Sequence, residues 1–92
     1  MTNKQFIEFA INSVVDYFND HKFMFPEKTD QFIITPDDVY IVWLCKTLQN
    51  HKALLSTNVV DGMYYEFTYN SDKDEAYLDA YKKWENKVIK PC

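Results

Sequence analysis

The feature that most constrains the fold is a run of β-branched and aromatic residues between positions 38 and 69, DVYIVWLCKTLQNHKALLSTNVVDGMYYEFTY. Such side chains favour β-strands, where they pack well on a pleated surface. The dipeptide Asp61-Gly62 is a turn signal, and Gly62, the only glycine in the chain, can adopt a positive φ. We therefore predict a three-stranded antiparallel meander, with strands over residues 39–48, 51–57 and 63–70.

The beginning of this run has two interpretations. Residues 35–38, TPDD, are typical of a helix start, because Thr35 can cap a helix and Pro36 suits the first helical position. Residues 36–49 could therefore be a helix or a strand. The sequence VYIVW at residues 39–43 favours the strand, since these side chains lose χ1 freedom in a helix. We predict at most one helical turn before the first strand.

The predicted turns also set a register. With a turn at residues 49–50, Leu44 lies opposite Leu55, and the second turn sets Leu55 opposite Tyr65. Because side chains alternate between the two faces of a sheet, this register predicts a core face and a second face. The core face holds Tyr40, Val42, Leu44, Leu48, Ala53, Leu55, Met63, Tyr65, Phe67 and Tyr69. The second face holds Val39, Ile41, Trp43, Cys45, Leu54 and Tyr64, together with Lys52, Ser56, Glu66 and Thr68.

Helices are predicted on both sides of the meander. Residues 3–20 repeat apolar side chains at three- and four-residue spacings, which indicates an amphipathic helix capped by Thr2 or Asn3. The sequence SDKDE at residues 71–75 has the spacing of a capping box, and apolar residues then recur every three or four positions from Tyr77 to Val88. We therefore predict a C-terminal helix that ends at Pro91.

Residues 22–35 join the first helix to the meander. Pro26 and the polar residues around it predict a surface loop, in which Phe32, Ile33 and Ile34 could form a fourth, short edge strand. The expected fold class is α+β, in a single domain over residues 1–92: an N-terminal helix, a three-stranded antiparallel meander and a C-terminal helix. The second face of that meander is too apolar to be left bare, so we expect a helix or a partner to cover it.

Composition limits the classes of function. The 92 residues are 47% hydrophobic and 26% charged, which is typical of a globular chain, and the net charge of −4 argues against a general binder of nucleic-acid backbones. No apolar run approaches the roughly 18 residues of a membrane span, and charged residues interrupt the N-terminal apolar positions, unlike a signal peptide. We expect a cytoplasmic protein.

The sequence predicts no catalytic residues, no metal site and no cofactor. A thiol nucleophile would need His51 beside Cys45, and the predicted register puts them on opposite faces. We expect Cys45 to be a buried free thiol and His51 to be a solvated residue near a turn, while a disulfide between Cys45 and Cys92 is the alternative. The acidic clusters at residues 37–38 and 72–75 could bind a cation or form a catalytic pair, but helix capping explains both.

Three segments resemble a known family: DDVYIVWLCKTLQNHKALLST, DGMYYEFTYN and DEAYLDAYKKWENKVI. Together, over residues 35–89, they are similar to small proteins of unknown function encoded by phages and prophages of low-GC Gram-positive bacteria. The resemblance implies a phage context and expression in a bacterial cytoplasm. It transfers no catalytic residues.

Small, acidic phage proteins without catalytic motifs often act by binding a host protein. We therefore expect a non-enzymatic phage accessory protein that binds and modulates a host protein, with inhibition of a host defence component as one form of this activity. The alternative is a nucleic-acid or nucleotide binding module that uses the tyrosine-rich strands. A small enzyme is a third hypothesis, and a homodimer is compatible with all three. The expected partner-binding residues are Ile41, Trp43, Leu54 and Tyr64, with an acidic rim of Asp72, Asp74 and Glu75.

Overall fold

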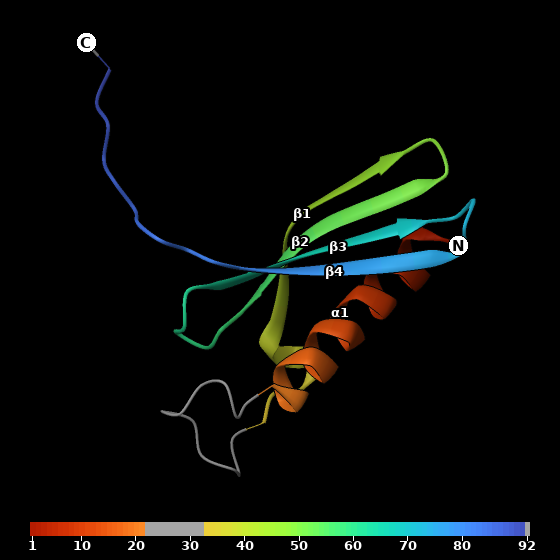
Figure 1. Ribbon diagram of the computed structural model, residues 1–92, viewed down its shortest axis with the longest axis horizontal. Helices are drawn as coiled ribbons and strands as arrows, with labels where there is room; N and C mark the ends of the chain where they lie inside the picture. Colours follow the sequence, from red (N-terminus) through yellow and green to blue (C-terminus); the bar gives the residue numbers. More distant parts are fainter. Residues whose placement is uncertain (22–32, 92) are drawn as a thin grey trace.

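The chain folds as one α-helix followed by a four-stranded antiparallel meander, with the strand order β1-β2-β3-β4. The structure is a computed structural model and describes residues 1–21 and 33–91. Figure 1 shows α1 lying along one face of the sheet. The elements are α1 (Asn3–Asp20), the 3₁₀ turn η2 (Pro36–Asp38), β1 (Val39–Thr47), β2 (Asn50–Thr57), β3 (Met63–Asn70) and β4 (Glu75–Lys82). The predicted α+β class is confirmed, with one strand more and one helix fewer than expected.

The N-terminal helix begins and ends where its periodicity predicts. Thr2 is the N-cap: its hydroxyl accepts from Gln5 N at 3.1 Å, and the Gln5 side chain accepts from Thr2 N at 2.9 Å. This reciprocal pair satisfies two backbone donors at the helix start. One side chain per turn is fully buried, in the series Phe6, Ala10, Val14 and Phe18.

The core lies between this helix face and one face of the sheet. Leu55 on β2 and Tyr65 and Phe67 on β3 are buried beneath α1. Leu55 lies directly opposite Tyr65, and Phe67 is the next residue of β3 that faces the helix. Phe9 meets Phe67 edge-on, with ring centroids 5.0 Å apart. The predicted pairing of β2 with β3 is confirmed, with Leu55 opposite Tyr65. Six of the predicted core residues are buried: Ala53, Leu55, Met63, Tyr65, Phe67 and Tyr69.

The pairing of β1 with β2 differs from the prediction for two reasons. The turn occupies residues 48–49 instead of 49–50, so Leu44 lies opposite Ala53 rather than Leu55. This shift of two residues keeps Leu44 on the same face of the sheet as α1, but Leu44 is 39% exposed, so its predicted place in the core is wrong. A β-bulge between Ile41 and Trp43 then adds one extra residue to β1. Since one added residue reverses the facing of everything before it, residues 39–41 are turned over.

The faces predicted for the start of β1 are therefore wrong. Val39 and Ile41 face α1, where Val39 is buried and Ile41 packs against the core. Tyr40 and Val42 are exposed instead of buried. Leu48, also predicted in the core, is 83% exposed in the β1–β2 turn. Trp43 and Cys45 follow the bulge and keep the predicted facing.

The predicted C-terminal helix is wrong, because residues 75–82 form β4 at the edge of the sheet. The sequence EAYLDAYK also alternates strictly, and its small or apolar members Ala76, Leu78 and Ala80 lie opposite core residues of β3. The presumed helix cap is a hairpin turn: Asn70 Oδ1 accepts from Asp72 N at 3.1 Å, and Asp74 has φ of 51°. Pairing with β3 overrides a helical periodicity that is equally visible in the sequence.

The structure describes only the last part of the connection between α1 and β1, from residue 33 onward. Most of the predicted loop at residues 22–35 lies outside the described residues. Of the proposed edge strand, residues 33–34 are not in a strand. Instead, the Asn19 side chain holds the Ile34 backbone, accepting from Ile34 N at 3.0 Å and donating to Ile34 O at 3.1 Å. The predicted single helical turn before β1 is confirmed as η2.

Among the described helices, none is both long enough and apolar enough to span a membrane.

After β4, residues 83–91 form neither helix nor strand and run clear of the sheet and the helix (Figure 1). We call residues 83–91 the arm. Lys83 N donates to Gly62 O at 2.7 Å, which fixes the point where the arm leaves the sheet.

Leu48 offers a test of the β1–β2 turn. Its φ of 56° belongs to the left-handed region, which costs a residue with a Cβ about 1–2 kcal/mol. A two-residue hairpin with a positive φ at its first central position favours glycine there. Leu48→Gly should therefore raise the free energy of unfolding by about 1 kcal/mol, measured by urea denaturation. Val60→Gly is the control, because Val60 is fully exposed and has no positive φ, so the glycine only increases the chain entropy of the unfolded state. Equal destabilisation by both changes would contradict this account.

Candidate functional site

The face of the sheet opposite α1 has no covering element among residues 1–21 and 33–91. The strand register assigns four side chains from each strand to this face. We call it the open face; its members are Tyr40, Trp43, Cys45, Thr47, Asn50, Lys52, Leu54, Ser56, Tyr64, Glu66, Thr68, Asn70, Glu75, Tyr77, Asp79 and Tyr81.

Aromatic side chains dominate one end of the open face. Tyr40, Ser56, Tyr64 and Tyr81 follow one another in register across all four strands. Ser56 is buried between its neighbours, and its hydroxyl donates to Met63 O at 2.8 Å. Tyr40 and Tyr81, at the two edges, are half exposed. This row carries tyrosine rings on β1, β3 and β4, at both edges of the sheet and beside the buried Ser56.

The next row changes from apolar to acidic across the sheet. Trp43 on β1 lies opposite Leu54, Leu54 lies opposite Glu66, and Glu66 lies opposite Asp79 on β4. Trp43 is 41% exposed. Glu66 Oε1 lies 3.5 Å from Lys52 Nζ, a surface ion pair that contributes little to stability. The open face thus combines exposed rings with three carboxylates, those of Glu66, Glu75 and Asp79, against the single ammonium of Lys52.

The structure brings together three of the four apolar residues expected to bind a partner. Trp43 and Leu54 are cross-strand neighbours on the open face, and Tyr64 lies on the adjacent strand. Ile41 does not join them, because the bulge turns it toward the core, so its predicted place on this surface is wrong.

The acidic residues expected to form a rim have different surroundings. Asp72 accepts two hydrogen bonds from Gln49 Nε2, at 2.9 and 2.8 Å, which tie the β3–β4 turn to the β1–β2 turn. Asp74 accepts from the Tyr69 hydroxyl at 2.7 Å, a bond that raises the pKa of Tyr69. Glu75 opens β4 on the open face and accepts from the Tyr77 hydroxyl. Asp72 and Asp74 therefore organise the turn, while Glu75 belongs to the surface.

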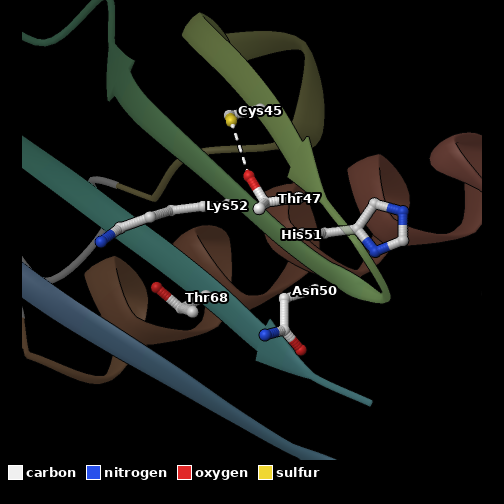
Figure 2. Close-up of a pocket in the computed structure, with 6 residues that line it drawn as sticks. All are labelled: Cys45, Thr47, Asn50, His51, Lys52 and Thr68. Carbon is white, nitrogen blue, oxygen red and sulfur yellow. Dashed lines mark hydrogen bonds between the residues drawn. The ribbon is translucent and has the colours of Figure 1, made fainter.

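A shallow hollow of about 210 Å³ lies on the open face beside the β1–β2 turn. Figure 2 shows Cys45, Lys52 and Thr68 around it, with the His51 ring directed away from them. The Cys45 thiol lies 3.5 Å from the Thr47 hydroxyl. Cys45 is an exposed free thiol, so the expectation that it would be buried is wrong. The predicted separation of Cys45 and His51 on opposite faces is confirmed, and Cys92 lies outside the described residues.

His51 is a core residue, although it was expected to be solvated. It is 2% exposed and stacks on Phe6 with ring centroids 4.9 Å apart. Its Nε2 lies 3.2 Å from Asn3 Oδ1, while its Nδ1 is buried without a partner. Burial lowers the pKa of His51, and the positive charges of Lys46 and the N-terminal amine lower it further. The ring is therefore a structural contact between β2 and the start of α1.

Metal ligation has no candidate centre in the part of the chain that the structure describes. No group of three or more histidine, cysteine, aspartate or glutamate side chains converges in residues 1–21 and 33–91. The carboxylates at residues 72–75 diverge to separate hydrogen-bond partners.

Among the aromatic and acidic members of the open face, sequence reasoning missed four: Tyr40, Tyr77, Asp79 and Tyr81. Tyr40 was assigned to the core face because the bulge in β1 has no recognisable signal in the sequence. The other three were lost because β4 was interpreted as a helix. The signal that could have found them is the alternation of Ala76, Leu78 and Ala80 with larger polar or aromatic residues.

Comparison with known proteins places the chain in a family. A family model described as a family of unknown function, DUF6275, matches residues 7–91. The chain belongs to this family. The match includes most of α1 and the arm as well as the sheet, so it extends beyond the segments in which the resemblance was noted. Neither a search of curated proteins nor a search of solved structures finds a match.

The buried ring of His51 gives this DUF6275 protein a defined response to acid. Because the pKa of His51 is lowered from its ordinary value of 6.5, the unfolded chain takes up the proton first as the pH falls. The stabilising effect of the neutral ring is complete above pH 6.5 and is lost as the pH falls toward the pKa of the folded state. The urea midpoint should therefore decrease as the pH falls below the ordinary histidine pKa of 6.5.

Comparison with variants isolates this effect from the titration of other groups. His51→Gln should reduce the decrease, whereas His21→Gln, which leaves the buried ring in place, should retain it. An identical pH dependence in wild type and His51→Gln would contradict the assignment.

Proposed function

We propose that this DUF6275 member is a non-enzymatic protein-binding module whose open face receives a partner protein. The observation that carries the proposal is the set of half-exposed rings on this face, Tyr40, Trp43, Tyr77 and Tyr81, between 41 and 52% exposed. Tryptophan and tyrosine are enriched among the few residues that dominate the binding energy of protein interfaces. A rigid sheet holds these rings in place, so little conformational entropy is lost when a partner covers them.

The surface also favours a particular partner chemistry. Exposed rings beside Glu66, Glu75 and Asp79 complement an apolar anchor flanked by lysine or arginine. Arginine and lysine can stack on the rings and pair with the carboxylates at the same time. The expected partner therefore presents an apolar and basic segment.

The biological setting of the proposal rests on the resemblance described above. Similarity to small proteins of phages and prophages supports a partner from the bacterial host, bound in the host cytoplasm. A host defence component is one such partner. No catalytic step is assigned, because Cys45 and the buried ring of His51 lie on opposite sides of the sheet.

A nucleic-acid binding module is the second candidate. An open four-stranded sheet with exposed tyrosines can stack bases, which favours single-stranded nucleic acid. The carboxylates of Glu66, on the inner strand β3, and Asp79, opposite it on the edge strand β4, would however repel a phosphate backbone. Protein binding accounts for both the rings and the charges.

The proposal predicts that Trp43 is the anchor of the complex. Trp43→Ser should weaken capture of the host partner by at least about tenfold, because a central tryptophan typically contributes this much or more. The measurement is a pull-down from host lysate, followed by titration of the captured protein against wild type and variant. Leu48→Ser is the matched control, since Leu48 is an exposed apolar residue outside the open face. Equal loss in both variants, or a salt-sensitive complex with single-stranded nucleic acid in place of protein, would refute the proposal.

The carboxylates should act mainly on the rate of association. Removing Glu75 or Asp79 as alanine variants should slow binding a few-fold at low salt and change the dissociation rate little. The difference should disappear at high ionic strength, where exposed charges are screened. Surface plasmon resonance with the captured partner measures both rates. A faster association after either change would mean that the partner surface is acidic.

A further inference from the structure

The arm carries large apolar side chains that the rest of the chain leaves in water. Trp84 is 96% exposed, and Val88 and Ile89 are 78% and 82% exposed. Single exposed apolar residues are common, but three on nine consecutive residues form an apolar segment without a covering surface. These three apolar side chains of the arm are free to pack against another surface.

The arm does not reach back to the open face of its own chain. It leaves the sheet at the edge strand β4, pinned by the hydrogen bond from Lys83 N to Gly62 O, and runs away from the other elements (Figure 1). No glycine or proline lies between residues 83 and 90 to reverse its direction. Within residues 1–21 and 33–82, no surface of the same chain receives the arm.

The chemistry of the arm complements that of the open face. In an extended chain, Trp84 and Val88 point to one side, while Lys83 and Lys87 point to the other. The arm carries three lysines against one glutamate, and the open face carries three carboxylates against one lysine. The apolar and basic segment that the open face favours is thus present in the chain itself.

We propose that the arm of one copy seats on the open face of a second copy, and that the exchange is reciprocal in a two-fold dimer. Trp84 covers the exposed rings near Trp43 and Tyr64, and the long lysine side chains on the other side of the arm bend around its backbone toward the carboxylates of β3 and β4. Reciprocity closes the assembly, because each copy offers one arm and one face. A one-way exchange would instead continue into a fibre.

The area available is sufficient for a stable dimer. A buried tryptophan contributes roughly 150–250 Å², and two-fold symmetry buries two copies of Trp84 against a similar area of sheet. These contacts alone supply half or more of the roughly 1,200 Å² of a specific interface. Val88, on the same side of the arm as Trp84, supplies further apolar area.

This inference deepens the proposed function and rests on it for the identity of the surface. If one open face receives both the arm and the protein partner, then the two compete. The dimer is the form of the free protein, and a partner binds by displacing the arm. The arm thereby raises the affinity that a partner needs and excludes weak, unspecific ligands.

The test measures association of the full chain by sedimentation equilibrium, with a reductant present so that disulfides cannot imitate a dimer. Wild type should be a dimer that weakens as salt is raised, because opposite charges meet in the interface. Trp84→Ser and Trp43→Ser should each weaken the dimer at least about tenfold. Tyr81→Ser is a second face variant, and Leu48→Ser is the control that should leave the dimer unchanged. Far-UV circular dichroism and urea midpoints establish that each variant is folded.

Mixing the variants gives the sharpest result. When Trp84→Ser is mixed with Trp43→Ser, the intact arm of one copy can seat on the intact face of the other. The other contact of this pair lacks both rings, but because Trp84 packs on Trp43, loss of the second ring there costs little more than loss of the first. The mixture should therefore associate more tightly than either variant alone. A monomeric wild type, a dimer insensitive to Trp84→Ser, or a mixture no tighter than its components would overturn the proposal.

The same experiments separate the dimer from the proposed function. A monomeric wild type that captures its partner through Trp43 overturns the arm exchange and leaves the proposed function standing. A dimer with the expected variant pattern, but no capture that depends on Trp43, supports the arm exchange and overturns the proposed function.

Discussion

The structure depends on the packing of one helix against one face of a four-stranded sheet. Phe6, Ala10, Val14 and Phe18 present a single buried stripe, and this stripe meets the inward side chains of β1, β2 and β3. This stripe packs on β2, β3 and the start of β1, while Leu44 on β1 and Ala80 on β4 remain exposed on the same face. Because β4 replaces the second helix, nothing in the described chain covers the other face. The open face is thus a direct consequence of having one helix and four strands.

The elements that the sequence predicts well are those with one periodicity only. Residues 3–20 repeat every three or four positions, and residues 63–70 alternate strictly, so their bounds agree with the structure. Residues 75–88 contain both periods, since Tyr77, Tyr81 and Val88 suit a helix while Ala76, Leu78 and Ala80 suit a strand. Local propensity cannot choose between them. The free edge of β3 decides, because pairing satisfies its backbone groups and buries Leu78 beside the core.

The members of the open face could be predicted from the sequence wherever the pairing register of their strands could be predicted. Leu54 and Tyr64 follow from the β2–β3 hairpin, whose Asp-Gly turn fixes its pairing. Trp43 was placed correctly because a shift of two residues preserves the face. Ile41 was misplaced because a bulge changes the facing by one residue and depends on tertiary packing rather than on a local signal. Here Val39 and Ile41 gain burial against α1 by turning over, and Tyr40 gains a place beside Ser56.

The chain contains more aromatic side chains than its core buries, and several of the others lie on the open face. The sequence contains seven tyrosines, seven phenylalanines and two tryptophans, which is more than one helix–sheet interface can bury. In the described residues the core takes Phe6, Phe18, Tyr65, Phe67 and Tyr69, and both tryptophans remain outside it. Even within the core the fit is imperfect: the Tyr65 hydroxyl is buried without a partner, and burial raises its pKa to about 12. Stability of the single chain therefore does not explain why Trp43 and Trp84 are present, whereas a second molecule on the open face gives both of them a contact.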